Sequence, residues 1–457
     1  MNQNNEQIKT TSATVAAATP SQQAGEAPAR RDPLWWVERC VWTKAMLTRL
    51  ASREPANQVW FRLWDKTYAP ANLQRACDKV LRNDGSAGVD EQTVAHFGRH
   101  AEVELQRLHE QLRDGTYRPQ PVRRAWIPKP GSNEKRPLGI PAVRDRIVQG
   151  ALRHVLEPIF ETNMAEHSYG FRPGRGAKDA LRRVDTLLKA GHAWVVDADL
   201  KSYFDTIPHE QLMALVKQRV GDGRVLALVE SFLRAGVMEE AAGWQATERG
   251  TPQGGVISPL LANLYLDPLD RQMAAAGWAM VRYADDFVIL CRTEAEAQAA
   301  LAAVTAWVNE AGLTLHPEKT RVVDASVPGG FDFLGYHFER GMKWPRKKSL
   351  LKLKDRVRAK TSRLEGRSLS AIITDVNGSL RGWYAYFQHS KANVFATVDG
   401  YVRRRLRSVL QWREDGVGKG IGATHQRWPN EWFARRGLLS LTAEHEWTRT
   451  IVKLRTH

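Results

Sequence analysis

The chain of 457 residues is poor in cysteine, with only Cys40, Cys77 and Cys291, and no two of them form a Cys-x-x-Cys pair. This scarcity argues against a disulfide framework and against a structural zinc site. The chain also lacks any apolar run of the roughly 18–20 residues that a membrane span requires, so we expect no membrane partner. Residues 1–31 contain no apolar segment of the kind found in signal peptides, and we therefore expect a cytoplasmic protein.

The composition is that of a globular protein. Hydrophobic residues make up 43% of the chain, and its length allows two or three domains with a substantial core. Residues 1–32 differ, because they are rich in Gln, Thr, Ala and Ser. We predict a disordered tail there and folded domains from residue 33 onward.

Positive charge is concentrated near the C-terminus. The formal net charge is +17, and residues 341–457 hold 25 Lys and Arg against 9 Asp and Glu. The preceding part of the chain is almost balanced, and the basic residues are interleaved with Trp, Tyr and Phe. A generic basic surface is one explanation, but this segregation favours a polyanionic partner, most simply a nucleic acid.

Apolar spacing indicates a mixed domain between residues 126 and 340. Residues 193–200 are predicted to form a buried strand, residues 281–290 a hairpin and residues 294–311 a helix. Further short strands are predicted at residues 314–316 and 320–323. Such a mixture indicates the α+β class, a sheet covered by helices.

Helical spacing dominates on both sides of that domain. Apolar residues recur at helical intervals through residues 33–125. After Trp344 apolar residues return at every third or fourth position, as amphipathic helices require. The residues concerned are Ile372, Val376, Leu380, Trp383 and Phe387, and then Val398, Val402, Leu406 and Val409.

Two adjacent carboxylates, Asp285 and Asp286, occupy the tip of the predicted hairpin, directly after Tyr283 and Ala284. Neighbouring aspartates repel each other in a folded site unless a cation lies beside them. Mg²⁺ suits oxygen ligands of this kind. A solvated turn is the alternative, since Asp is common in turns.

A second acidic element ends the predicted strand at residues 193–200. Alternation along the strand puts Asp197 and Asp199 on one face. A two-metal phosphoryl-transfer centre needs acids from more than one strand, and Asp199 together with Asp285 and Asp286 could supply them. Alternatively, Asp199 caps the helix that follows.

This order of motifs resembles the reverse transcriptases. The hairpin matches their Tyr-x-Asp-Asp box, and Asp199 matches their first catalytic aspartate. The resemblance implies a right-hand polymerase with fingers, a palm built on an antiparallel sheet, and two Mg²⁺ ions. Asp199, Asp285 and the backbone carbonyl of Leu200 would hold these ions, with Asp286 beside them.

Further boxes follow in the order of that family, each with an implied role in binding the deoxynucleotide triphosphate (dNTP). Residues 127–130 and 135–141 resemble the segment that grips the triphosphate, where a lysine point charge and an arginine fork are suitable partners. A bulky ring five residues after Asp199 would exclude a 2′-hydroxyl, unless it is merely a core aromatic. The residues implied to bind dNTP are Lys129, Arg136, Phe204, Gln253 and Lys319.

Two features resemble the maturase–reverse transcriptases of bacterial group II introns. Residues 83–90 resemble the extra N-terminal box of that branch, and residues 168–176 form a basic, glycine-rich turn suited to a template backbone. Residues 380–387 and 401–406 resemble the maturase domain, which also serves as thumb. Solvated arginines on an ordinary polymerase thumb are the alternative. The implied RNA-binding residues are Arg172, Arg175, Arg381, Arg403, Arg404, Arg405 and Arg407.

The resemblance also divides the chain. We expect a disordered tail (1–32), a helical extension with the start of the fingers (33–125), fingers and palm (126–340), a thumb/maturase domain (341–415) and a short basic tail (416–457). The part after Glu414 contains no cysteine. We therefore expect no HNH endonuclease, whose metal module uses cysteine and histidine.

These motifs together imply an RNA-directed DNA polymerase encoded by a group II intron. It would extend a DNA primer or target with dNTPs on an RNA template and bind intron RNA to assist splicing and mobility. One alternative is a splicing maturase whose polymerase is dispensable. Another is a domesticated reverse transcriptase that serves DNA repair or phage defence. The motifs give no indication of the oligomeric state.

Overall fold

The computed structural model describes residues 32, 34–52, 58–128, 135–364, 366–416 and 422–455. Contacts divide the chain into two units, Met1–Trp36 and Val37–His457. In the first unit only four residues are described, and the backbone N–H of Leu34 donates to the Asp32 carboxylate at 2.8 Å. The predicted tail, except for Asp32, and Lys129 lie outside the described residues.

The second unit begins with helices, as the apolar spacing predicts. The described helices before residue 120 are α1 (Lys44–Ser52), α2 (Trp64–Tyr68), α3 (Pro70–Asn83), α4 (Val94–Arg99) and α5 (Ala101–Arg113). Helix α6 (Val143–Glu161) follows and is buried over most of its length. Asn72 of α3 ties it to the preceding helices by donating to the carbonyl of Ala151 at 3.0 Å.

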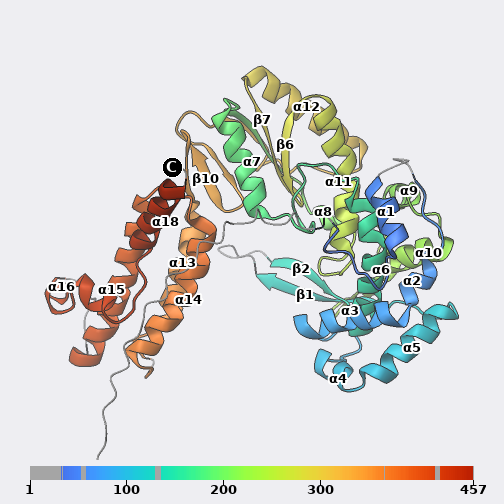
Figure 1. Ribbon diagram of the computed structural model, residues 1–457, viewed down its shortest axis with the longest axis horizontal. Coiled ribbons are helices and arrows are strands. Elements are labelled where there is room, and N and C mark those ends of the chain that lie inside the picture. Colours follow the sequence, from blue (N-terminus) through green and yellow to red (C-terminus); the bar gives the residue numbers. More distant parts are fainter. Residues whose placement is uncertain are drawn as a thin grey trace, which may run out of the picture. The chain divides into compact units, whose positions relative to one another are not determined.

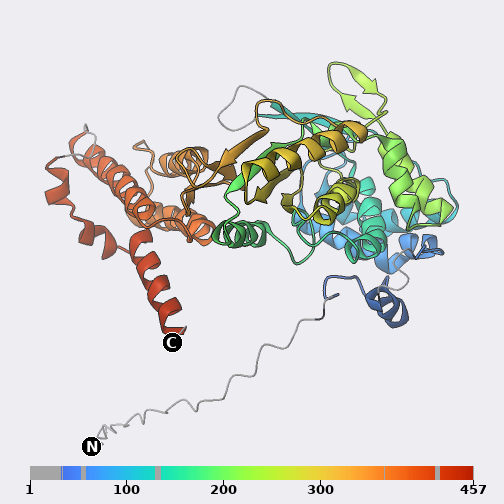
Figure 2. The ribbon, with the colours of Figure 1, turned by 90° about the horizontal axis from the view of Figure 1, so that it is seen from above.

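A first sheet, here called the finger sheet, has the strand order β2-β1-β4-β5. It consists of β1 (Val122–Pro128), β2 (Lys135–Ile140), β4 (Val237–Glu239) and β5 (Gly243–Gln245). The β4–β5 hairpin forms one edge of it (Figure 2). Between β1 and β4 the chain forms, among other elements, α8 (Tyr203–Thr206), α9 (His209–Lys217) and α10 (Gly223–Arg234).

A second sheet, the palm sheet, is antiparallel throughout and has the order β6-β7-β3-β8. Its strands are β3 (Trp194–Asp199), β6 (Ala279–Tyr283), β7 (Asp286–Cys291) and β8 (Arg321–Asp324). Three helices pack against it, namely α7 (Ala177–Lys189), α11 (Ser258–Ala275) and α12 (Glu294–Glu310) (Figure 1). The predicted α+β class with an antiparallel palm sheet is confirmed.

One predicted strand of the palm is wrong. Residues 314–316 form no strand, and Leu315 makes only an isolated bridge to Leu200. The reason is local: Lys201 donates to the carbonyl of Thr314 at 2.8 Å and His316 donates to that of Asp199 at 2.7 Å, after which the chain turns away. The pairing therefore anchors the segment after α12 to the end of β3.

A small antiparallel sheet, β11-β10-β9, leads into the C-terminal helices. The strands are β9 (Phe331–Phe333), β10 (Tyr336–Glu339) and β11 (Met342–Pro345), and the helices that follow are α13 (Lys347–Lys360), α14 (Leu369–Phe387) and α15 (Asn393–Asp415). All nine apolar residues from which the helical spacing was inferred are buried in one core cluster. No helix among the described residues is long and apolar enough to cross a membrane.

The segment expected to be a short tail forms three further helices. They are α16 (Thr424–Arg427), α17 (Asn430–Ala434) and α18 (Leu441–Arg455). Trp428, Phe433 and Leu441 are buried in the same cluster as α14 and α15. The apolar residues of this segment are too sparse to predict helices by periodicity, but Trp428, Phe433 and Leu441 each have a place in a core built by other elements.

Candidate active site

The palm sheet brings the predicted acids together. Asp199, at the end of β3, lies directly opposite Asp286, the first residue of β7, and Asp285 occupies the turn before it. Side chains of directly opposed strand residues have Cβ atoms about 5 Å apart. The strand register thus joins two motifs that are far apart in the sequence.

Burial and mutual repulsion control the charges of these acids. Burial, and then the neighbouring Asp197, Asp199 and Asp285, raises the pKa of Asp286 to about 7. The pKa of Asp285 is also raised, chiefly by burial and then by Asp199. Lys319 compensates part of this charge, since its Nζ lies 2.5 Å from Asp199 Oδ2. A cation placed among these carboxylates would therefore be bound favourably.

The hairpin that carries the acids rests on a buried arginine. Arg282 of β6 is 1% exposed and pairs through two nitrogens with Asp270 of α11, at 2.8 and 2.5 Å. Its third nitrogen donates to the carbonyl of Ala284 and to Asn263 Oδ1, both at 2.9 Å. Ala284 has φ +61°, a conformation that non-glycine residues adopt only at a cost. The arginine helps to hold this turn.

Arg282 and Asp270 were not among the predicted site residues, although the sequence contains a signal for the arginine. An arginine between Val281 and Tyr283 interrupts an otherwise apolar strand, and such a residue needs a buried partner. The partner comes from α11, where the spacing suggests only an apolar helix. The sequence therefore indicated the need for a partner but not its identity.

The glycine-rich turn at residues 168–176 supports the same hairpin. Tyr169 donates to the carbonyl of Arg282 at 2.8 Å, and Arg282 donates to that of His167 at 3.0 Å. A Cβ at Gly170 would lie 2.3 Å from the backbone nitrogen of Ala284, so only glycine fits. This turn lies against the acidic hairpin, which accounts for its glycine without any contact to a template.

The prediction that Arg172, in that turn, contacts RNA is wrong. Its side chain is buried, pairs with Glu161 at 2.9 Å and donates to the carbonyl of Ser168 at 2.8 Å. Its donors are thus used within the protein. Arg175 is half-buried and donates to the carbonyl of Glu166, so it too has an internal partner.

The predicted dNTP-binding boxes meet beside the finger sheet. Gly139 of β2 donates to the backbone carbonyl of Gln253 at 2.7 Å, which joins two of them. Arg136 is exposed on β2, opposite Ile127 of β1. Phe204 is half-buried, with its ring centroid 6.5 Å from that of Phe171.

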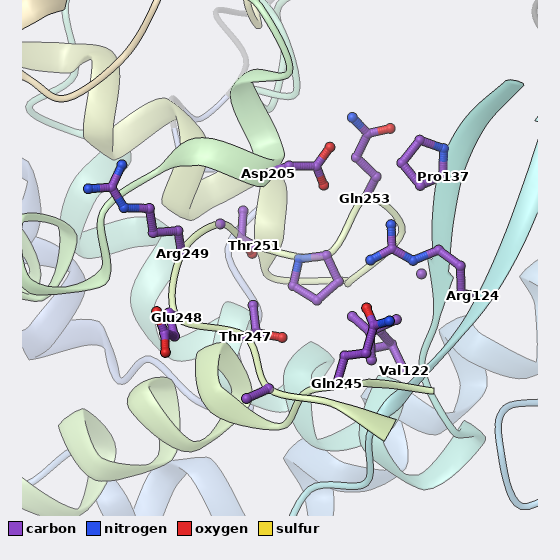
Figure 3. A pocket seen from close by; sticks show the side chains of 15 residues that line it. Val122, Arg124, Pro137, Asp205, Gln245, Thr247, Glu248, Arg249, Thr251 and Gln253 are labelled. Carbon is purple, nitrogen blue, oxygen red and sulfur yellow. The ribbon is translucent and has the colours of Figure 1, made fainter. Parts of the chain in front are cut away.

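A cavity of about 380 Å³ lies at this junction. Its lining includes Arg124 of β1, Asp205, Arg249 and Gln253. Figure 3 shows Asp205 and Gln253 on one side of the cavity and Gln245 on the other. The cavity is polar, with charges of both signs, and brings together residues from the finger sheet and from the segment at residues 246–253.

The predicted RNA-binding arginines of the C-terminal helices fall into two groups. Arg407 is a correction: it is 2% exposed, donates to the carbonyl of Trp428 and to Asn430 Oδ1, both at 2.9 Å, and therefore anchors α15. Arg405 is half-buried and donates to Thr361. Arg381 and Arg404 are exposed and Arg403 is half-buried, so these three can still reach a ligand.

The acids have the ligand atoms that Mg²⁺ prefers, but they are not grouped closely enough to form a complete metal site. Carboxylate oxygens are the ligands that Mg²⁺ prefers, and the raised pKa of Asp286 reports a deficit of positive charge. Among the described residues, no three or more His, Cys, Asp or Glu side chains are grouped so as to hold a metal ion. The Nζ of Lys319 lies beside Asp199, where a metal would compete with it.

Two families match consecutive parts of the chain. Residues 127–338 match the reverse transcriptase (RNA-dependent DNA polymerase) family. Residues 350–419 match the group II intron maturase-specific domain. The fold of the palm sheet and the position of the C-terminal helices agree with this division.

Several proteins are similar to this chain. The group II intron-encoded protein LtrA of Lactococcus lactis subsp. cremoris is 38% identical over 235 residues, which is 50% of this chain but only 38% of LtrA. Protein YkfC of Escherichia coli (strain K12) is 35% identical over 335 residues, covering 64% of this chain and 87% of YkfC.

Among solved structures, a partial Cas6-RT-Cas1–Cas2 complex is 28% identical with a TM-score of 0.36, covering 54% of this chain and 41% of that chain. Both family matches and the extensive similarity to YkfC agree with the motifs. The chain belongs to the bacterial group II intron reverse transcriptases/maturases.

Proposed function

We propose that this chain is an RNA-directed DNA polymerase that extends a primer with dNTPs. The observation that carries the proposal is the pairing of Asp199 with Asp286 across two strands, with Asp285 in the adjoining turn. Acids from separate strands are what two-metal phosphoryl transfer requires. We also propose that the palm and fingers span residues 126–340 and that residues 341–415 form the thumb/maturase domain.

Each site residue has a proposed task. Asp199, Asp285 and the Leu200 carbonyl, with Asp286 beside them, would hold two Mg²⁺ ions, whose positive charge would favour deprotonation of the primer 3′-hydroxyl and departure of pyrophosphate. Arg136 and Lys129 would hold the triphosphate. The ring of Phe204 would occupy the space that a 2′-hydroxyl needs.

The remaining two residues act around the acids. Lys319 already neutralises Asp199, and its ammonium can move to a phosphate when Asp199 takes another partner. Gln253, tied to β2 through its backbone, leaves its side-chain amide free to bind sugar or phosphate. These tasks need no movement of the palm sheet itself.

Replacing the paired acids tests the polymerase. Asp285→Asn with Asp286→Asn should lower primer extension on an RNA template at least about a hundredfold, the usual scale for removing a group that stabilises the transition state. The matched control is Glu414→Gln with Asp415→Asn, two adjacent exposed acids on α15. Undiminished extension by the palm variant would show that the assignment is wrong.

A second function, binding of intron RNA to assist splicing, has separate support. Residues 350–419 match the maturase-specific domain, and residues 341–457 carry most of the excess positive charge. We expect Arg403→Gln with Arg404→Gln to weaken binding of intron RNA and to make it less sensitive to salt, because each lost phosphate contact reduces counterion release. If the variant and the wild type bind intron RNA with equal affinity and an equal salt slope, these two arginines do not contact the RNA.

A further inference from the structure

A cavity of about 610 Å³ lies where α7, β11, the α14–α15 loop and α18 meet. Its lining contains one carboxylate, Asp185, and four side chains of permanent positive charge, Lys189, Lys343, Lys391 and Arg449. A second cavity of about 160 Å³ shares Asp185 and Lys343 with it and adds Lys178 and Arg182. We call the two cavities together the basic trough.

The positive charge of the basic trough is only partly compensated within the protein. Asp185 is shared between Lys189 at 2.7 Å and Lys343 at 2.8 Å, so one carboxylate serves two ammonium groups. In the described part of the chain, Lys391 and Arg449 have no carboxylate partner. The Nζ of Lys391 instead lies 3.5 Å from the ring centroid of Trp344, a contact that positions the ammonium without neutralising it.

Two histidines report the local potential. Burial, and then Lys343, lowers the pKa of His389 below its usual range. Burial, and then Arg449, lowers the pKa of His445. The lowered pKa favours the uncharged form of each ring. Besides burial, Lys343 and Arg449 are the largest charged influences on the two rings, opposed in part by Asp185 and Glu446, so positive charge prevails there.

The larger cavity of the basic trough is separate from the acidic site. The end of α7, which carries Asp185 and Lys189, connects through a four-residue turn to the start of β3 at Trp194. Asp199 lies at the other end of β3, about 17 Å away at the usual rise of a strand. The lining residues come from four parts of the chain and meet only through the docking of the C-terminal helices.

We propose that the basic trough binds the phosphodiester backbone of a nucleic acid at a site distinct from the polymerase centre. Lysine and arginine are the usual phosphate partners, and the trough offers several of them on rigid elements. The proposal extends the proposed function, since it requires that the chain handles nucleic acid. Folded RNA and duplex DNA share this backbone chemistry and are the two possible sources.

The test replaces the two unpaired cations. Lys391→Glu with Arg449→Glu is compared with Lys217→Glu and Arg292→Glu, two exposed cations outside the trough with the same change of charge. Binding of a labelled RNA hairpin and of duplex DNA of equal length is measured across a salt series without dNTP. At about 0.1 M salt the trough variant should bind at least about tenfold more weakly, with a salt slope smaller by about 2.

Each outcome decides the proposal. A selective loss of RNA binding supports the trough as an RNA site, and an equal loss for both probes supports general backbone binding. Unchanged affinity and slope, or an equal loss in the control, would overturn it. If the glutamate variant fails to fold, Lys391→Gln with Arg449→Gln removes the same charges without new repulsion. The same binding measurements can be made in the Asp285→Asn, Asp286→Asn variant. They test nucleic-acid binding by the trough even if the proposed polymerase function is wrong.

Discussion

Asp199 and Asp286 lie directly opposite each other on two antiparallel strands of the palm sheet, and the Nζ of Lys319 lies 2.5 Å from Asp199 Oδ2. Such a pair of acids lowers the stability of the fold in the absence of a cation and favours the binding of one. Variants of these acids, and of the groups that hold them in place, should therefore separate the requirements of folding from those of the reaction.

The stability of the chain should depend on pH through Asp286. Its pKa is about 7, against 3.8 for an unperturbed aspartate, because burial and the neighbouring acids favour the protonated form. The folded state therefore binds this proton more tightly. The resulting stabilisation is complete below about pH 4 and is lost as the pH rises through 7.

Asp286→Asn removes that dependence. At pH 8 the variant should be more stable than the wild type by up to about 4 kcal/mol, since one pKa unit corresponds to about 1.4 kcal/mol. Urea unfolding at pH 5 and pH 8 measures both effects. A variant that is no more stable at pH 8 than the wild type would contradict the raised pKa.

Millimolar Mg²⁺ should raise the melting temperature at pH 8. A ligand that binds only the folded state stabilises it by mass action, and the carboxylates are ionised at this pH. Asp199→Asn with Asp285→Asn should abolish the increase, whereas Glu414→Gln with Asp415→Asn should retain it. Thermal melts with and without EDTA give the comparison, and an equal increase in all three proteins would place the bound Mg²⁺ elsewhere.

Arg282→Met should destabilise the fold strongly. The change leaves Asp270 buried without its partner, and breaking a buried ion pair in this way costs about 3–5 kcal/mol. It also releases the carbonyl of Ala284, so any folded protein should extend primers poorly.

Arg321→Met is the matched control for Arg282→Met. Arg321 pairs with Asp197 at 3.3 Å, but half of its side chain is exposed, so its loss should cost less than about 1 kcal/mol. Denaturant unfolding ranks the two variants. Equal losses would show that Arg282 has no special role beneath the hairpin.

Gly170→Ala should destabilise the palm by roughly 2–4 kcal/mol, because the new Cβ would overlap the backbone of Ala284 and must displace the hairpin. Gly400→Ala is the comparison. Gly400 lies on α15 with open space around it, and alanine there should stabilise the helix by up to about 1 kcal/mol. In a thermal melt, the melting temperature should fall for Gly170→Ala and rise for Gly400→Ala. A melting temperature of Gly170→Ala equal to that of the wild type would show that the hairpin does not need a glycine at this position.

Phe204→Ala should weaken the choice between deoxyribonucleotides and ribonucleotides. Removing the half-buried ring opens space next to Phe171, and discrimination that rests on fit alone amounts to roughly 10–200-fold. The ratio of kcat/KM for dNTP and rNTP should fall by at least about tenfold, mainly through faster use of the ribonucleotide. If the ratio is unchanged, Phe204 is a packing residue next to Phe171.

Much of the fold could be predicted because its signals are local. The strand that ends at Asp199 and the hairpin around Asp285 follow from short apolar runs with acids at their ends. The helix through Leu380 and Trp383 follows from apolar spacing. The helices after residue 422 were missed because residues such as Phe433 show no period of their own and are buried only against α14 and α15.

Charged residues show where sequence reasoning ends. Arg172, Arg404 and Arg407 occur in similar basic, loop-like or helical contexts, yet two of them are buried. Their burial depends on partners distant in the chain, such as Glu161 for Arg172 and Trp428 for Arg407. A sequence pattern gives the charge of a side chain but not the groups that surround it.

The sequence alone therefore determined the family, the class of fold and the identity of the acids, because these depend on residue types in a fixed order. The tertiary structure decided which of those residues face each other. It set Asp199 opposite Asp286 through the strand register, placed Arg282 beneath the hairpin and assembled a basic trough from Lys343, Lys391 and Arg449. Such arrangements arise when distant segments pack, since burial and electrostatic neighbours are properties of the folded chain.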